Sequence, residues 1–185
     1  MNAAESAVFT VGEGTLRIAR GDIASWPAQA VVNAANAHLA GGSGVDGAIH
    51  SAAGPKLPAA CREIIARRGP LKAGEAEPTP GFEMAAQYIL HAVGPIWRGG
   101  SHGEPEALAS AYRSCLRLCR EHGIVSVAFP AISCGAYGYP VELAMPIALK
   151  ELAEGLRRGD TQEAAMVLYS AQAYETWLAF ARRTL

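Results

Sequence analysis

The sequence predicts an α/β fold in which a mostly parallel sheet is covered by helices on both faces. Short apolar runs rich in Val, Ile and Tyr alternate along the chain with longer stretches of helical periodicity. Strands joined by helices of about ten or more residues lie parallel, because such crossovers return the chain to the same edge of the sheet. No internal repeat, low-complexity segment or linker interrupts this pattern, so we expect one domain over residues 1–185.

The first half of the chain supplies two strands and two helices. Residues 15–19 (TLRIA) alternate as a strand does and end at Gly21-Asp22, whereas residues 30–33 (AVVN) are interpreted as a short buried strand. A helix over 45–53 follows a glycine cluster and ends at Gly54-Pro55. A second helix over 56–68 ends in the same way at Gly69-Pro70.

The second half repeats the alternation with longer helices. An amphipathic helix places Leu108, Tyr112, Cys115, Leu116 and Cys119 on one face. The predicted order is strand 87–93, helix 104–122, strand 126–132, helix 141–157, strand 165–169 and helix 173–183.

Composition excludes several classes of protein. The 185 residues are 50% hydrophobic with a net charge of −1, which excludes a disordered chain and argues against a strongly basic nucleic-acid binder. The four Cys form no paired framework, so we expect a reducing compartment and no disulfide scaffold. The N-terminus does not resemble a signal peptide, and no apolar run is long enough to span a membrane. We therefore expect a cytoplasmic protein.

Short polar side chains are scarce in this sequence. The only Asp residues are Asp22, Asp46 and Asp160, and the only Asn residues are Asn2, Asn33 and Asn36. Drift in base composition explains why they are rare. It does not explain why four of the six fall in or beside segments that leave predicted strand ends, where ligands bind in open α/β sheets.

The first candidate loop runs from Asn33 and Asn36 through Gly41-Gly42-Ser43-Gly44 to Asp46, at the start of a helix. Glycines let backbone N–H groups approach an anion closely, and the helix N-terminus adds the positive end of its dipole. The loop therefore suits a phosphate without Lys or Arg. Its G-x-G-x-x-G pattern, at Gly42, Gly44 and Gly47, does not indicate a Rossmann fold, because about eight residues separate Asn33 from Gly42 and the nearest later acid is Glu63. A flexible surface loop would explain the glycines but not the Asn and Asp beside them.

Two further loops leave strand ends. The segment 133–140 (SCGAYGYP) surrounds Tyr137 with small residues, and two such loops could clamp a diphosphate between oriented amides. Asp22 in Gly21-Asp22-Ile23 could accept a hydrogen bond from an exocyclic amine. Most aspartates in that setting are N-caps or turn residues, so both interpretations stay open.

Metal and thiol chemistry find little support in the sequence. Cys115 and Cys119 have a spacing that could share a metal, yet both lie on an apolar face without a second pair, which favours core packing. His50 and His91 have no partner at ligand spacing. Cys134 lies in a candidate loop, but no His is placed to activate it by a recognisable motif. We expect no metal and no cofactor.

The sequence resembles the macrodomain family, specifically its MacroD-type branch, over about residues 12–180. The blocks that carry the resemblance are GDI at 21–23, VVNAANAHLAGGSGVDGAIHSAAG at 31–54, GEAEPTPGFEM at 74–84, YILHAVGP at 88–95, AFPAISCGAYGYP at 128–140 and VLYSAQAYETW at 167–177. The resemblance implies a three-layer α/β/α fold with a mixed, mostly parallel sheet that binds ADP-ribose. Because the family pattern also has a proline at Pro130, we keep that strand and expect a local break in its hydrogen bonding.

Carried over by position, the family pattern implies a role for each loop. Asp22, with Ile23 beside it, would accept from the adenine amine, and Tyr169 would stack on the adenine ring. Asn36 would hold the distal ribose, and Asp46 would activate or orient the attacking water. Asn33 is interpreted as a buried structural amide. The residues that would enclose the diphosphate and distal ribose are Gly42, Ser43, Gly44, Val45, Ser133, Gly135, Ala136 and Tyr137. Ser43 departs from the glycine that the family often has there.

The resemblance implies an enzyme that hydrolyses ADP-ribosyl esters, either mono-ADP-ribose on acidic protein side chains or O-acetyl-ADP-ribose. Such an ester needs a positioned water, some base assistance and a fixed ribose. Either Asp46 or a phosphate of the substrate could be the base. The alternative is a module that reads ADP-ribose without turnover. RNA or poly-ADP-ribose binding is a weaker third class, because no basic-aromatic stripe is present. We expect ADP-ribosylated proteins or O-acetyl-ADP-ribose as partners, no membrane association, and a monomer.

Overall fold

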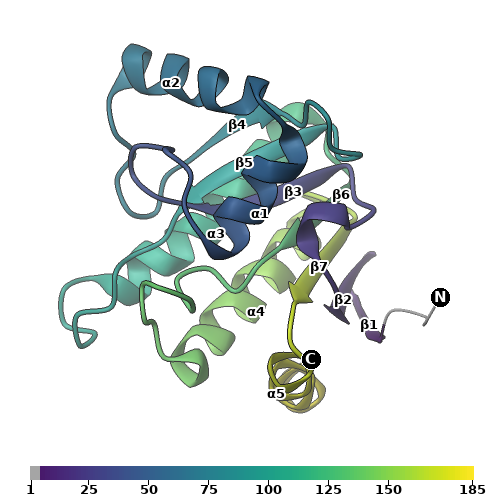
Figure 1. Cartoon of the computed structure of the whole chain (residues 1–185). Helices are drawn as coiled ribbons and strands as arrows, with labels where there is room; N and C mark the ends of the chain where they lie inside the picture. Colours follow the sequence, from purple (N-terminus) through teal and green to yellow (C-terminus); the bar gives the residue numbers. More distant parts are fainter. Residues whose placement is uncertain (1–4) are drawn as a thin grey trace.

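The computed structural model describes residues 5–185 and has a seven-stranded mixed sheet at its centre (Figure 1). The strands follow the order β1-β2-β7-β6-β3-β5-β4. The five inner strands are parallel, and the two edge strands β1 and β4 pair antiparallel with their neighbours. The strands are β1 (Ser6–Val11), β2 (Gly14–Arg20), β3 (Ala30–Ala35), β4 (Ala76–Pro80), β5 (Tyr88–Val93), β6 (Ser126–Phe129) and β7 (Glu163–Leu168).

Helices cover both faces of the sheet, which gives three layers and confirms the predicted fold class. The helices are η1 (Ile23–Ser25), α1 (Gly44–Ala53), α2 (Lys56–Arg68), α3 (Glu104–His122), α4 (Val141–Arg158) and α5 (Ala171–Thr184). Buried side chains of α3, α4 and α5 form one apolar cluster on the sheet, and those of η1, α1 and α2 form the other. Cys115 and Cys119 are fully buried in the first cluster, as core packing predicts. Figure 1 shows α2 and α5 at opposite ends of the sheet.

The strand predicted over 126–132 is wrong at its end. Strand β6 ends at Phe129, and Pro130 lies just beyond it. A proline has no N–H for the ladder and fixes its own φ, so here it ends the strand rather than breaking it locally. In contrast, β3 continues past the predicted Asn33 to Ala35, which carries the chain further towards the first candidate loop.

Two strands at the edges of the sheet were not predicted. Strand β1 pairs with β2 through the short Gly12-Glu13 turn, but its side chains are mostly exposed or half-buried, so its apolar alternation is weak. Strand β4 contains Pro78 and Pro80, which are tolerated on an edge strand because one side of its backbone needs no partner.

The sheet has a short seam between β6, its central strand, and the neighbouring strand β3. They pair only at Ala30↔Val127 and Val31↔Ala128, and neither strand is paired with the other beyond those positions in the described chain. This seam is also where the connections change direction, since β5 lies on one side of β3 and β7 on the far side of β6. In open α/β sheets such a switch point opens a crevice at the carboxyl ends of the strands.

Within residues 5–185, no helix is both long enough and apolar enough to cross a membrane.

Candidate functional site

A cavity of about 840 Å³ opens at the carboxyl ends of β3, β5, β6 and β7, beside the seam. Its volume lies in the range of small-molecule and cofactor sites. Most of the predicted site residues line it: Asn36, Gly42, Ser43, Gly44, Val45, Asp46, Ser133, Gly135, Ala136, Tyr137 and Tyr169. Asp22 and Ile23 do not line it.

The first wall of the cavity is the segment 36–46, between β3 and the start of α1. The side-chain amide of Asn36 ties this loop together, because Nδ2 donates to the carbonyl of Gly41 (2.9 Å) and Oδ1 accepts from the N–H of Ala40 (3.0 Å). One N–H and one lone pair of Asn36 are left for a ligand. Gly47 allows the loop to fold back on the helix, since a Cβ there would lie 2.6 Å from the carbonyl oxygen of Gly42.

Asp46 is the buried end of the first wall. It is only 7% exposed, and Oδ1 accepts a hydrogen bond from Asn33 Nδ2 at 2.8 Å. His50, one turn later on α1, has Nε2 3.4 Å from the same oxygen without forming a hydrogen bond. A Cβ on Gly42 would lie 3.3 Å from Oδ2, so this second oxygen lies beneath the glycine loop that lines the cavity.

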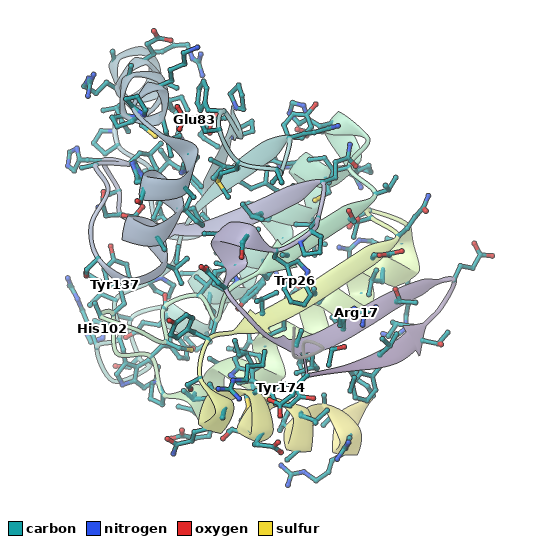
Figure 2. All side chains as sticks on the ribbon, turned by 45° about the vertical axis from the view of Figure 1, so that its right-hand side comes forward. Arg17, Trp26, Glu83, His102, Tyr137 and Tyr174 are labelled. Atoms are coloured by element: carbon teal, nitrogen blue, oxygen red, sulfur yellow. The ribbon has the colours of Figure 1, made fainter. Side chains whose placement is uncertain are left out.

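The second wall is the segment 130–140, between β6 and α4. The N–H of Tyr139 donates to the carbonyl of Ser133 (2.9 Å), and the N–H of Trp97 donates to the carbonyl of Tyr137 (2.9 Å). The Trp97 and Tyr139 rings pack with centroids 4.7 Å apart. These contacts join the second wall to the neighbouring loop 94–103, and Figure 2 shows Tyr137 and His102 on the same side of the molecule.

Glu104 fixes the loop 94–103 that supports the second wall. Its carboxylate accepts from the N–H groups of Arg98, Gly100 and His102 at 2.9, 3.2 and 2.7 Å. Burial disfavours the charge, but these backbone donors outweigh burial and hold the pKa of Glu104 at about 2. The supporting loop is therefore anchored by an ionised carboxylate at neutral pH.

Ser133 has the least usual environment in the second wall. Its φ is +65°, a left-handed value that is uncommon for a residue with a side chain, and its buried hydroxyl has no partner within residues 5–185. A Cβ on Gly94 would lie 2.1 Å from this hydroxyl, so only glycine fits beneath it. The neighbouring Cys134 is a poor nucleophile, because burial raises the pKa of its thiol to about 11.

Both walls present unpaired backbone N–H groups. In α1 the N–H groups of Gly44, Val45 and Asp46 precede the first intrahelical bond, and those of Gly135, Ala136 and Tyr137 form no hydrogen bond within the described chain. All six residues line the cavity. Among the described residues that line it, none is Lys, Arg or His, and Asp46 is the only acid. The cavity is therefore suited to bind an anion through amides.

The strand ends of β2 and β7 lie beyond the two walls. Tyr169 is 83% exposed directly after β7, so its ring is free to cover a planar group. The N–H of Gly21 donates to the carbonyl of Leu168 (2.9 Å), which places Asp22 near Tyr169 at the rim. Asp22 is exposed, and its Oδ1 caps η1 by accepting from the N–H of Ala24 (2.9 Å). Ile23 is 5% exposed in the core, so its side chain faces away from solvent.

Sequence reasoning missed the part of the cavity that α5 forms. Gln172, Ala173, Thr176 and Trp177 line it together with Ser170, whose hydroxyl caps the helix by accepting from the N–H of Ala173. The rule that ligands bind beyond strand ends applies equally to β7, and it could have identified this segment. It could not have identified the contact between Asn33 and Asp46, since neither spacing nor composition shows which buried groups meet.

Comparison with known proteins gives a consistent family. The Macro domain model matches residues 32–148. A macro domain-containing protein of Ralstonia nicotianae is 47% identical over 171 residues, which cover 91% of this chain and 96% of that protein. A Salmonella gallinarum protein named O-acetyl-ADP-ribose deacetylase is 48% identical over 143 residues, or 77% of this chain and 80% of that protein. A mutant macrodomain of Oceanobacillus iheyensis, solved with ADP-ribose, has a TM-score of 0.92 and 38% identity, covering 97% of this chain and 98% of that one. The family model spans more than half of the sequence, and the relatives from Ralstonia nicotianae and Oceanobacillus iheyensis match nearly its full length. This chain therefore belongs to the macrodomain family.

Proposed function

We propose that this protein binds ADP-ribose and hydrolyses ADP-ribosyl esters, either mono-ADP-ribose on Asp or Glu side chains or O-acetyl-ADP-ribose. One observation carries the proposal: Asp46 is the only charged side chain among the described residues that line a cavity rich in free amides. A site that only held a diphosphate would gain nothing from a carboxylate, because the two negative charges repel each other.

Binding of ADP-ribose is supported by the two walls. The free N–H groups of both walls belong to residues that line one cavity, so a diphosphate bound between the walls would receive hydrogen bonds from each side without Lys or Arg. The structure of the Oceanobacillus iheyensis relative with ADP-ribose supports the same ligand. Tyr169 and Asp22 would then receive the adenine at the β2–β7 end.

Hydrolysis needs little beyond this arrangement. Water adds across the ester bond and yields ADP-ribose and the free acid, so no cofactor is required. The free N–H and lone pair of Asn36 would fix the distal ribose, and Asp46 Oδ2 would orient the water or take its proton. The deacetylase name of the Salmonella gallinarum relative supports an ester as the substrate.

The test compares wild type with Asp46→Asn on O-acetyl-ADP-ribose and on a Glu-linked ADP-ribosylated protein. The amide keeps an acceptor for Asn33 but loses the charge, so kcat should fall by about 100-fold or more while the Kd for ADP-ribose changes by less than about threefold. Release of ADP-ribose is followed by mass spectrometry, and Kd by calorimetry.

The matched control is Asp160→Asn. Asp160 is also buried but binds Arg120 and Arg158 outside the cavity, so the control should be less stable than wild type with kcat unchanged. A wild-type protein that binds ADP-ribose tightly but releases it from neither substrate would be a reader module and would refute the enzymatic proposal.

A further inference from the structure

We propose that Thr79, His91 and Asn33 form a buried hydrogen-bonded chain that positions the catalytic carboxylate Asp46. The inference rests on the proposed hydrolase function and assigns positioning residues to it. None of the three residues lines the cavity. They act on the reaction only through Asp46.

The chain crosses three neighbouring segments of the sheet. The Oγ1 of Thr79 on β4 lies 2.9 Å from His91 Nε2 on β5, and His91 Nδ1 lies 3.2 Å from Asn33 Nδ2 on β3. The same Asn33 nitrogen lies 2.8 Å from Asp46 Oδ1 on α1. Thr79 is 4% exposed, and both His91 and Asn33 are fully buried. The carboxylate is thus connected to an edge strand of the sheet by consecutive short contacts.

Only one arrangement of protons satisfies these contacts. Asp46 Oδ1 is an acceptor, so the amide nitrogen of Asn33 must face it as the donor, and a flipped amide would bring two oxygens together. The second N–H of the same nitrogen faces His91 Nδ1, which must therefore be unprotonated. His91 then carries its proton on Nε2 and donates it to Thr79 Oγ1.

Burial keeps the His91 ring, and with it the hydrogen-bonded chain that leads to Asp46, uncharged. Desolvation, with a smaller effect from His50, lowers the pKa of His91 to about 3, so the ring is neutral at neutral pH. A protonated ring would turn Nδ1 into a donor and oppose the Asn33 N–H. In the tautomer that Asn33 requires, the hydroxyl of Thr79 accepts the Nε2 proton, and Asn33 in turn leaves Asp46 Oδ2 free on the side of the glycine loop.

Packing alone does not account for this chain. Around it, the face of the sheet beneath α1 and α2 is apolar, with Val31, Ile89 and Ile49 fully buried. Burying three polar side chains there costs free energy that an apolar set of the same shape would avoid. Asn33 Oδ1 is buried with no partner in the described chain, so even the amide is not fully satisfied. The hydrogen-bonded chain from Thr79 to Asn33 does, however, fix the direction of the N–H that Asn33 donates to Asp46.

The test uses a pair of variants at Thr79, the position furthest from the cavity. Thr79→Val keeps the shape but removes the acceptor for His91, and Thr79→Ser restores it. Thr161→Val is the matched control, because Thr161 is a second buried threonine, 3% exposed, whose hydroxyl has no partner among residues 5–185. Each protein is assayed for kcat and KM with O-acetyl-ADP-ribose, and the histidine rings are observed by ¹⁵N NMR. The His91 signals are assigned by their loss in His91→Gln.

We expect Thr79→Val to lower kcat by about 10-fold with KM unchanged, and Thr79→Ser and Thr161→Val to stay within about twofold of wild type. The ring of His91 should be the Nε2–H tautomer in wild type and Thr79→Ser, and the share of that tautomer should fall in Thr79→Val, where Nε2–H has lost its acceptor. Equal kcat in Thr79→Val and Thr79→Ser, or an Nδ1–H ring in wild type, would overturn the inference while leaving the hydrolase proposal intact. A wild type without hydrolysis would overturn both.

Discussion

The two walls of the cavity are held in place by different kinds of contact. The first wall depends on side-chain polar atoms: Asn36 binds the loop, and Asn33 holds Asp46 from below. The second wall depends on backbone hydrogen bonds, on the packing of Trp97 against Tyr139, and on the buried hydroxyl of Tyr112, which accepts from the N–H of Ile132. Both present free amides, but only the first presents a carboxylate. The comparison separates two tasks: the polar side chains of the first wall can direct a reacting group, whereas the second wall offers a ligand backbone N–H groups but no charged side chain.

The largest effect is expected where the second wall tolerates no added atom. In Gly94→Ala, the new Cβ would lie 2.1 Å from the hydroxyl of Ser133 and 2.6 Å from Ile132 Cγ2, so the wall must move. We expect the free energy of unfolding to fall by about 2 kcal/mol. The affinity for ADP-ribose, measured by calorimetry, should fall by about 100-fold through the loss of amide contacts.

The control for this change is Gly135→Ala, within the second wall itself. A Cβ at Gly135 has no atom within 4 Å, and its φ is not left-handed, so thermal stability should equal that of wild type. If Gly94→Ala binds ADP-ribose as tightly as wild type, the second wall does not depend on its backbone geometry, and the contrast between the walls fails.

An intermediate effect is expected at the rim, outside both walls. Asp22 has two carboxylate oxygens, of which Oδ1 already caps η1. Asp22→Asn keeps one oxygen for the cap but presents an N–H donor to the adenine amine. We expect unchanged thermal stability and about 10-fold weaker binding of ADP-ribose by calorimetry. Equal affinity would show that Asp22 is only a cap, and the two walls would then account for binding without it.

A further effect is expected beneath the first wall, as a pH dependence of stability. The folded protein holds the pKa of His91 at about 3 against an ordinary value of 6.5. Below pH 6.5, His91 binds a proton in the unfolded chain but stays neutral in the folded protein. The free energy of unfolding therefore decreases as the pH falls towards 3. Between about pH 6 and pH 4, wild type should lose about 1.4 kcal/mol per pH unit more than His91→Gln in urea unfolding. Parallel curves for the two proteins would contradict this, because the acid-range contribution of Glu104 is common to both.

The sequence predicted the cavity better than it predicted the polar groups behind it. Loops that follow strand ends are visible in the pattern, and those around Asn36 and Tyr137 do line one cavity. The buried state of Asn33 was also predicted and is confirmed. Its contacts with His91 and Asp46 were not, because they join residues 58 and 13 positions away whose proximity depends on strand register and on where α1 begins.

In the fold, too, features set by local sequence were predicted, whereas features that depend on position in the sheet were not. The helices over 56–68 and 104–122 were predicted to the residue, since periodicity and glycine stops are local signals. The edge strand β4 was missed because Pro78 and Pro80 are read as breakers unless the edge position is known. Strand β6 was predicted too long because the resemblance outweighed the local effect of Pro130, which ends the strand.

The short seam between β3 and β6 has a consequence for how the protein responds to its ligand. Within residues 5–185, the strand ladder joins the half-sheet β1-β2-β7-β6 to the half-sheet β3-β5-β4 at two residue pairs only. A molecule that fills the cavity contacts the first wall on one half-sheet and the second wall on the other. It therefore links the two half-sheets where the hydrogen bonding between β3 and β6 is incomplete. The binding free energy of the ligand therefore adds to the free energy needed to separate the two half-sheets. Slower amide hydrogen exchange along β3 and β6, rather than at the sheet edges, would be the signature of an occupied cavity.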